Sequence, residues 1–228
     1  MVAYLSLGLN CQPIMHAVEN NLVPDRANGR LTSVFDLCLT TRQALCHFIQ
    51  TDFADFFDDI ALIENPKGSF SSPTGELIYS FVADASYGDL IVNVKHGMIF
   101  NHESPGHPFL PSTESWSTPT RFCQNAFREF RERYARRIAN FLAEIADSIA
   151  CEREVVFLMR ANLENGDQVA DAIKTRFPKL KFKIKILEFL EIDRMVNLEM
   201  QEFFHGSVGE GRGKKSVGES EMVVYGWA

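Results

Sequence analysis

The sequence predicts an α/β fold with a mostly parallel central sheet flanked by helices. Two observations support this: buried-type strands alternate with helical segments, and the later part runs in the order strand, helix, strand. Such alternation builds a parallel sheet with helices on its faces. A third observation is that 228 residues, 46% of them hydrophobic, suffice for a sizeable core. We therefore expect a single α/β domain over residues 1–228, with a β-rich middle insertion and a long loop.

The first third of the chain predicts one strand and several helical segments. Residues 2–7 form a short apolar run, and Pro13 suits the first turn of a helix that ends near Asn20. A second helix is expected from about Thr41 to Ile49. Residues 51–59 are rich in Phe and Asp and predict another helical turn or two.

The middle of the chain has strand composition. Strands are expected at residues 76–82 and 90–94, with a third at 98–100. Residues 101–119 are rich in Pro, Ser, Thr, Gly and His, so we interpret them as a long functional loop.

The strongest helix signal follows Pro119. Apolar residues step by threes and fours, and arginines occupy much of the remaining surface, which is typical of an amphipathic helix; the apolar set is Phe127, Phe130, Tyr134, Ile138, Phe141, Ile145 and Ile149. The remaining expectations are strands at 154–159, 181–187 and 221–227, helices at 166–177 and 191–204, and a mobile glycine-rich segment at 205–220.

Composition narrows the classes of partner. The formal net charge of -7 argues against nucleic acid as the main partner. Five cysteines without a CxxC pair support neither a disulfide framework nor a zinc knuckle, so we expect reduced thiols in the cytoplasm and no metal centre. No run reaches the roughly 18 to 20 apolar residues of a membrane span, and the N-terminus lacks a basic leader.

Cys11 is the residue most expected to carry chemistry, because it lies where the first strand turns into the first helix. Ligands of α/β sheets bind beyond the carboxyl ends of strands. The partial positive charge of a helix N-terminus favours a thiolate. Backbone amides from Gly8 through Asn10 to Gln12 would then receive the oxyanion of an acyl-transfer intermediate. The alternative is that Cys11 is a small buried hydrophobic residue.

A thiol nucleophile needs a base, and His102 is our candidate among six histidines because it begins the long loop. Asp36 follows apolar residues and either orients the imidazole or caps local backbone. Arg160 and Asn162 follow the strand at 154–159, where the arginine either holds a carboxylate or phosphate of the substrate or forms a surface salt bridge.

The residues around Cys11 also resemble a known family. SLGLNCQP at residues 6–13 closely resembles the SLGxNC opening of a bacterial family of unknown function that is catalogued as papain-like cysteine peptidases. Later segments agree in order up to about residue 160: VFD at 34–36 with the family's PFDW, GMIFNHE at 97–103 with YGIxFxHDF, RYARRI at 133–138 with RYxRRI, and VVFLMR at 155–160 with the following strand and arginine. Leu37 and Glu103 stand where the family has Trp and Asp.

The resemblance implies a site with Cys11 as nucleophile and His102 as base. The NCQ turn is also similar to capsule-polysaccharide enzymes proposed to move acyl groups from coenzyme A. The sequence therefore predicts a thiol-dependent hydrolase or acyltransferase that acts on a peptide, saccharide or small molecule. It requires no cofactor, and a coenzyme A thioester is a candidate acyl donor. The alternative is a non-catalytic module that binds a nucleotide, coenzyme A or a sugar at the sheet edge.

Overall fold

The computed structural model describes residues 2–8, 11–25, 27–63, 69–71, 77–80, 90–100, 102, 127–160, 166–187 and 224–226. The expected helix at 191–204, the glycine-rich segment at 205–220 and nearly all of the loop at 101–119 lie outside these residues. The division into domains stays a prediction.

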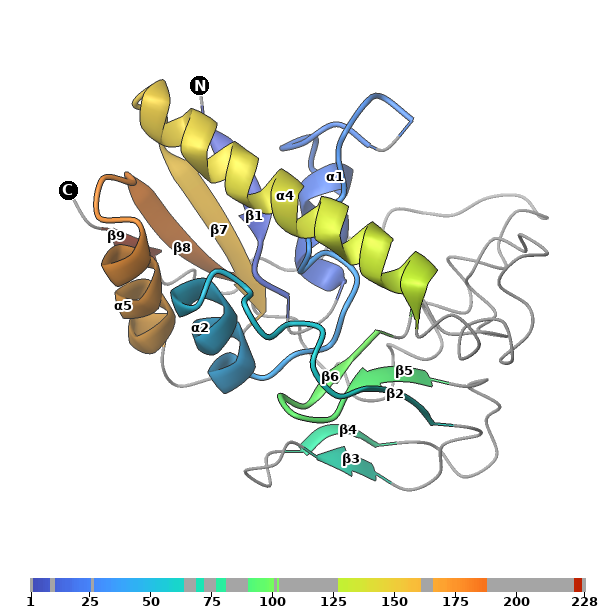
Figure 1. Ribbon diagram of the computed structural model, residues 1–228. Coiled ribbons are helices and arrows are strands. Elements are labelled where there is room, and N and C mark those ends of the chain that lie inside the picture. Colours follow the sequence, from blue (N-terminus) through green and yellow to red (C-terminus); the bar gives the residue numbers. More distant parts are fainter. Residues whose placement is uncertain are drawn as a thin grey trace.

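The fold is mixed α/β, and its main sheet has the order β1-β7-β8-β9 (Figure 1). Strands β1 (Ala3–Ser6), β7 (Val155–Arg160) and β8 (Phe182–Leu187) are parallel. Strand β9 (Val224–Gly226) joins the edge in the antiparallel direction. The sequence predicted all four strands. Apolar runs indicated β1 and β7, as is typical of buried parallel strands, strict alternation indicated β8, and β9 lies within the strand expected at residues 221–227.

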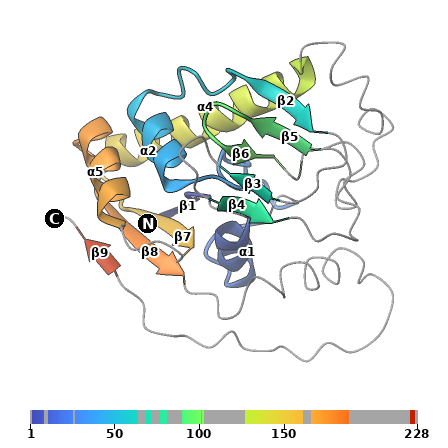
Figure 2. The same ribbon diagram turned by 90° about the horizontal axis from the view of Figure 1, so that it is seen from below.

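Helices cover both faces of this sheet (Figures 1 and 2). Helix α1 (Gln12–Glu19) packs on one face through Ile14 and Ala17, which contact Leu158. Helices α2 (Arg42–Gln50), α4 (Arg128–Ala150) and α5 (Gly166–Arg176) pack on the other face, where Phe157 points. Phe157 and Leu158 are neighbours in β7 and face opposite sides of the sheet, because successive side chains of a strand alternate between its two faces.

A second sheet is antiparallel and has the order β2-β5-β6. It consists of β2 (Ile60–Ile63), β5 (Leu90–Asn93) and β6 (Met98–Ile99), and a separate hairpin pairs β3 (Ser69–Ser71) with β4 (Leu77–Ser80). The sequence predicted β4, β5 and β6 but neither β2 nor β3.

The helical turns expected at residues 51–59 are wrong. This segment, which we call the 51–59 turn, is a series of tight turns. Asp52, Phe53 and Asp59 have positive φ angles of 53°, 60° and 51°, a backbone region that a right-handed helix does not use.

Aromatic rings in edge-to-face contact join the two sheets through α4. Phe100, which follows β6, lies 4.8 Å from Tyr134 of α4 and 5.8 Å from Phe56, measured between ring centroids. Phe141, two turns further along α4, lies 5.5 Å from Phe35. The residues at 130, 134, 141 and 145 are buried as the periodicity predicted. No helix among the described residues is long and apolar enough to cross a bilayer.

Candidate functional site at the end of β1

The end of β1 lies against the segment at residues 35–40. Gly8 has a φ angle of +75°, and a Cβ atom there would lie 3.1 Å from Thr40 Cγ2 and 3.3 Å from Phe35 Cβ. Only glycine combines this backbone conformation with so close an approach. Gly8, just past the end of β1, is therefore packed closely against the loop that carries Asp36.

Cys11 occupies the N-cap position of α1 and is 4% exposed. The amide of Leu7 donates to the carbonyl of Leu158 at 2.9 Å, which continues the parallel pairing of β1 with β7 to the carboxyl end of both strands. Arg160 is the last residue of β7, and its charge acts on the Cys11 thiol. The predicted placement of Cys11 and Arg160 at one edge of the sheet is confirmed.

Burial opposes the thiolate that the helix N-terminus was expected to favour at Cys11. Burial raises the pKa of the thiol to about 11, and its own backbone amide and the positive charge of Arg160 offset only part of that effect. Loss of water around the sulfur thus outweighs the favourable helix end. At neutral pH the Cys11 sulfur carries its proton.

Asp36 is buried inside the adjoining loop. One carboxylate oxygen, Oδ2, accepts from the guanidinium of Arg30 and, at 2.7 Å, from the amide of Ser33. The other oxygen, Oδ1, is buried and has no hydrogen-bond partner among the described residues. Burial raises the pKa of the Asp36 carboxyl, against the opposing effects of Arg30, Ser33 and Arg137. Asp36 therefore fixes the loop through Arg30 and Ser33.

Arg137 is part of this site although the sequence analysis assigned it to the solvated face of α4. It is 6% exposed, its guanidinium lies 4.6 Å from the centroid of the Tyr134 ring, and its charge acts on both Asp36 and Cys38. The sequence did indicate the burial of Arg137, because position 137 falls on the same helix face as the buried positions 130, 134 and 141. An arginine in an apolar stripe is a candidate for a buried ion pair.

Cys38 lies close enough for the Cys11 sulfur to affect its titration, and burial strongly raises its thiol pKa. Its sulfur donates to the carbonyl of Val34 at 3.7 Å. Cys38 therefore provides a neighbouring buried thiol, which the sequence analysis did not connect with Cys11.

His102 is buried, at 8% exposure. An antiparallel bridge joins Leu39 to Ile99. Asp36 precedes Leu39 by three residues and His102 follows Ile99 by three, so both residues are close to this bridge along the chain.

The remaining predicted site residues are placed as follows. The amide of Gly8 donates to Ser6 Oγ at 3.2 Å, and its expected role in an oxyanion hole stays a prediction. Gln12 begins α1 and is half-buried. Asn10 and Asn162 lie outside the described residues.

The raised pKa of Cys11 predicts slow alkylation. At pH 8 we expect iodoacetamide to modify Cys11 at least about 100-fold more slowly than a thiol with the reference pKa of 9.0, because the thiolate fraction falls tenfold per pKa unit. The rate should rise about tenfold per pH unit until near pH 11. Peptide-level mass spectrometry measures it, with the exposed Cys151 as internal comparison. Faster labelling of Cys11 than of Cys151 at pH 6 would contradict the raised pKa.

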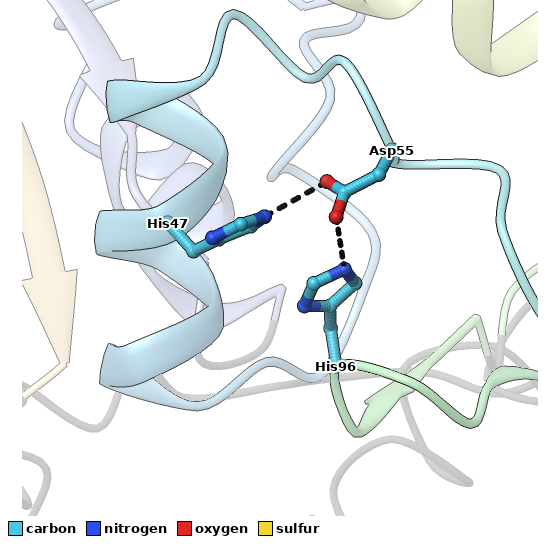
Figure 3. A group of neighbouring side chains, drawn as sticks. All are labelled: His47, Asp55 and His96. Atoms are coloured by element: carbon cyan, nitrogen blue, oxygen red, sulfur yellow. Dashed lines mark hydrogen bonds and ion pairs between the residues drawn. The ribbon is translucent and has the colours of Figure 1, made fainter.

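The structure also gathers three side chains that the sequence analysis left apart: His47 of α2, Asp55 of the 51–59 turn and His96 of the turn between β5 and β6 (Figure 3). The three residues are 8 and 41 positions apart along the chain, so no local spacing indicates their contact. Desolvation opposes the charged form of the Asp55 carboxyl, but hydrogen bonds from His47 and Lys95 and the charges of both histidines lower its pKa overall.

Comparison with known proteins found no relative of the chain. No family model, no curated protein and no solved structure matches the chain. The resemblance of residues 6–13 to the cysteine peptidase family stays a prediction.

Proposed function

We propose that the protein is a thiol-dependent enzyme of acyl transfer, in which Cys11 attacks an acyl carbon and the acyl group then passes to water or to a second substrate. One observation carries this proposal: the Cys11 sulfur is placed at the N-cap of α1 on the carboxyl edge of the parallel sheet, beside Arg160. This edge is where α/β proteins bind ligands. The first-turn amides of α1 face an oxyanion there.

The proposed mechanism uses a base rather than a preformed thiolate. Because the pKa of Cys11 is raised to about 11, its proton must leave as the sulfur attacks. His102 takes this proton, the S–C bond forms, and the bond to the leaving group breaks as His102 returns the proton to it. Water or an acceptor hydroxyl then attacks the thioester carbon and gives its proton to His102. The S–C bond breaks, the acyl product leaves, and His102 returns the proton to the Cys11 sulfur.

Two further residues have supporting roles in this proposal. Asp36 is the candidate to orient the imidazole of His102, through a hydrogen bond to Oδ1 that would form only when substrate binds, because this oxygen has no hydrogen-bond partner among the described residues. Arg160 binds a carboxylate or phosphate of the substrate. The phosphates of a coenzyme A thioester would suit this side chain, which makes that thioester one candidate acyl donor beside esters and amides. A peptide or saccharide is the candidate acceptor or substrate.

A second candidate function is a non-catalytic binding module for an anionic ligand. The protonated state of Cys11 favours it, as do three arginines, Arg30, Arg137 and Arg160, that act on Asp36 or Cys11. Such a module would hold a nucleotide, coenzyme A or a charged sugar at the same edge without bond cleavage.

A substrate panel separates the two functions. The intact protein is incubated between pH 6 and 9 with an activated acetyl ester, acetyl-coenzyme A with and without saccharide acceptors, and fluorogenic peptides. We expect acyl release at a rate that rises as an imidazole loses its proton. The products distinguish hydrolysis from transfer. Thermal stabilisation by coenzyme A with no acyl release from any donor would overturn the enzyme and support the binding module.

A further inference from the structure

The histidine–aspartate cluster of Figure 3 combines donors from three separate segments. His47 Nε2 lies 2.8 Å from Asp55 Oδ1, and His96 Nε2 lies 3.0 Å from Asp55 Oδ2. The two imidazole rings are stacked, with centroids 4.5 Å apart and planes inclined by 25°. Both rings therefore direct the same nitrogen toward one carboxylate, as Figure 3 shows.

These separations are close to those of a coordination sphere. One ligand atom of each residue lies within 4.8 Å of the other two. Ligands about 2.0 to 2.1 Å from a tetrahedral metal ion are about 3.3 Å from each other. A metal ion between the imidazoles and the carboxylate would need only small side-chain movements. All three residues are partly exposed, so an ion has access and water is able to complete its coordination.

The backbone around the cluster is fixed by a buried amide. Asn93 donates through Nδ2 to the carbonyl of Phe56 at 2.9 Å and accepts through Oδ1 from the amide of His96 at 2.8 Å. One fully buried side chain thus ties the residue after Asp55 to His96 itself. Hydrogen bonds of this kind hold the ligand residues in position before a metal ion binds, as a metal site requires.

The other ligand segments are also anchored. The hydroxyl of Thr51 donates to the carbonyl of His47 at 2.9 Å, which fixes the end of α2 to the start of the 51–59 turn. Arg176 of α5 binds both oxygens of Asp52 at 2.6 and 2.5 Å. The turn that carries Asp55 is therefore held from two sides.

We propose that His47, Asp55 and His96 bind a divalent transition-metal ion of the Zn²⁺ type, with two imidazole nitrogens, one carboxylate and at least one water. Two imidazoles and a carboxylate form a donor set used by zinc and by other first-row metals. Each Nε2 loses its hydrogen on binding, and in a neutral ring Nδ1 takes a proton in exchange. This site uses other residues than the proposed acyl-transfer site and does not depend on that function.

In the structure, the positive charge next to the Asp55 carboxylate comes from Lys95. Its ammonium lies 3.0 Å from Asp55 Oδ2 and 3.0 Å from Asp58 Oδ2. A metal ion on Asp55 would displace one of these contacts, and Asp58 would retain the lysine. Lys95 therefore competes with the metal.

The test is a titration of the full-length, chelator-treated protein with Zn²⁺ by calorimetry and with Co²⁺ by visible absorption. We expect one ion per chain. His47→Gln or His96→Gln should weaken binding at least about 100-fold, and Asn93→Ala about 10- to 100-fold as a positioning residue. His16→Gln is the control. His16 lies outside the cluster and makes an exposed side-chain hydrogen bond with Asn20, so its replacement should leave the metal affinity unchanged.

Lys95→Gln removes the competitor at a partly exposed position and should tighten binding about two- to fivefold, the range of a surface ion pair. This variant keeps all three ligands, so it tests the site even where a histidine variant unfolds. Circular dichroism checks the fold of each variant. Cobalt–thiolate charge-transfer absorption, less than one ion per chain, or equal affinity in wild-type and folded His96→Gln protein would each overturn the proposal.

Discussion

Replacing Cys11 with alanine is expected to lower the rate of acyl transfer by about 10⁴-fold or more, to the background of the uncatalysed reaction. The reason is that no other described thiol lies at the N-cap of a helix on this edge of the sheet. Without the sulfur no covalent intermediate forms. Arg160 and the first turn of α1 then retain only the ability to bind the substrate. Initial rates with the best substrate of the panel measure the effect.

Cys38→Ala is the matched control, because it removes a second buried thiol next to the first. It should keep the rate within about threefold once its lower stability is taken into account, since Cys38 donates to Val34 and contacts no substrate in the proposed mechanism. A Cys11→Ala protein that keeps wild-type turnover would show that the nucleophile is elsewhere. Equal losses in the two variants would point to a packing effect.

Asp36→Ala is expected to lower the free energy of unfolding by about 3 to 5 kcal/mol. The substitution leaves the guanidinium of Arg30 and the buried charge of Arg137 without their carboxylate, and it leaves the amide of Ser33 without an acceptor. Removing one member of a buried ion pair costs more than the pair contributes, because the remaining charge stays desolvated. Urea denaturation followed by circular dichroism measures the change.

Asp58→Ala provides the comparison for Asp36. Asp58 is 56% exposed and pairs with the similarly exposed Lys95, so its loss should cost less than about 1 kcal/mol. Asp36→Asn should cost less than Asp36→Ala, because the amide oxygen is able to accept from Ser33. Equal stabilities of the Asp36→Ala and Asp58→Ala proteins would contradict the role assigned to the buried pair.

Local patterns were sufficient to predict the elements that form the site. The apolar runs at residues 2–7 and 154–159 gave two adjacent parallel strands, and Pro13 marked the helix after the first of them. Cys11 and Arg160 could be placed at one edge because parallel strands end on the same side. This part of the prediction needed only the order of strands and helices.

The pKa of the Cys11 thiol could not be predicted from local patterns in the same way. A helix N-terminus lowers the pKa of a thiol, but tertiary packing, including the contact of Gly8 with Phe35 and Thr40, determines how much water remains near Cys11. That packing joins residues far apart in the sequence. The burial of Arg137 is different, because its position in the apolar stripe of α4 was visible beforehand.

The cluster of His47, Asp55 and His96 was beyond sequence reasoning for a physical reason. Its ligands come from α2, from the 51–59 turn and from the turn between β5 and β6, and the side chain of Asn93 connects the last two. The 51–59 turn was expected to be helical, and a helix there would direct Asp55 differently. Positive φ angles at Asp52 and Phe53 depend on tertiary anchors such as Arg176.

The most direct measurement of the central claim is the intact mass of the protein after brief reaction with an activated acetyl ester or thioester at pH 7.5, followed by an acid quench and peptide mapping. The proposed mechanism predicts one acetyl group per chain on Cys11, its absence in Cys11→Ala and its retention in Cys38→Ala. Acetylation confined to the exposed Cys151 or to lysines, with Cys11 unmodified under every donor, would contradict the assignment of Cys11 as the nucleophile.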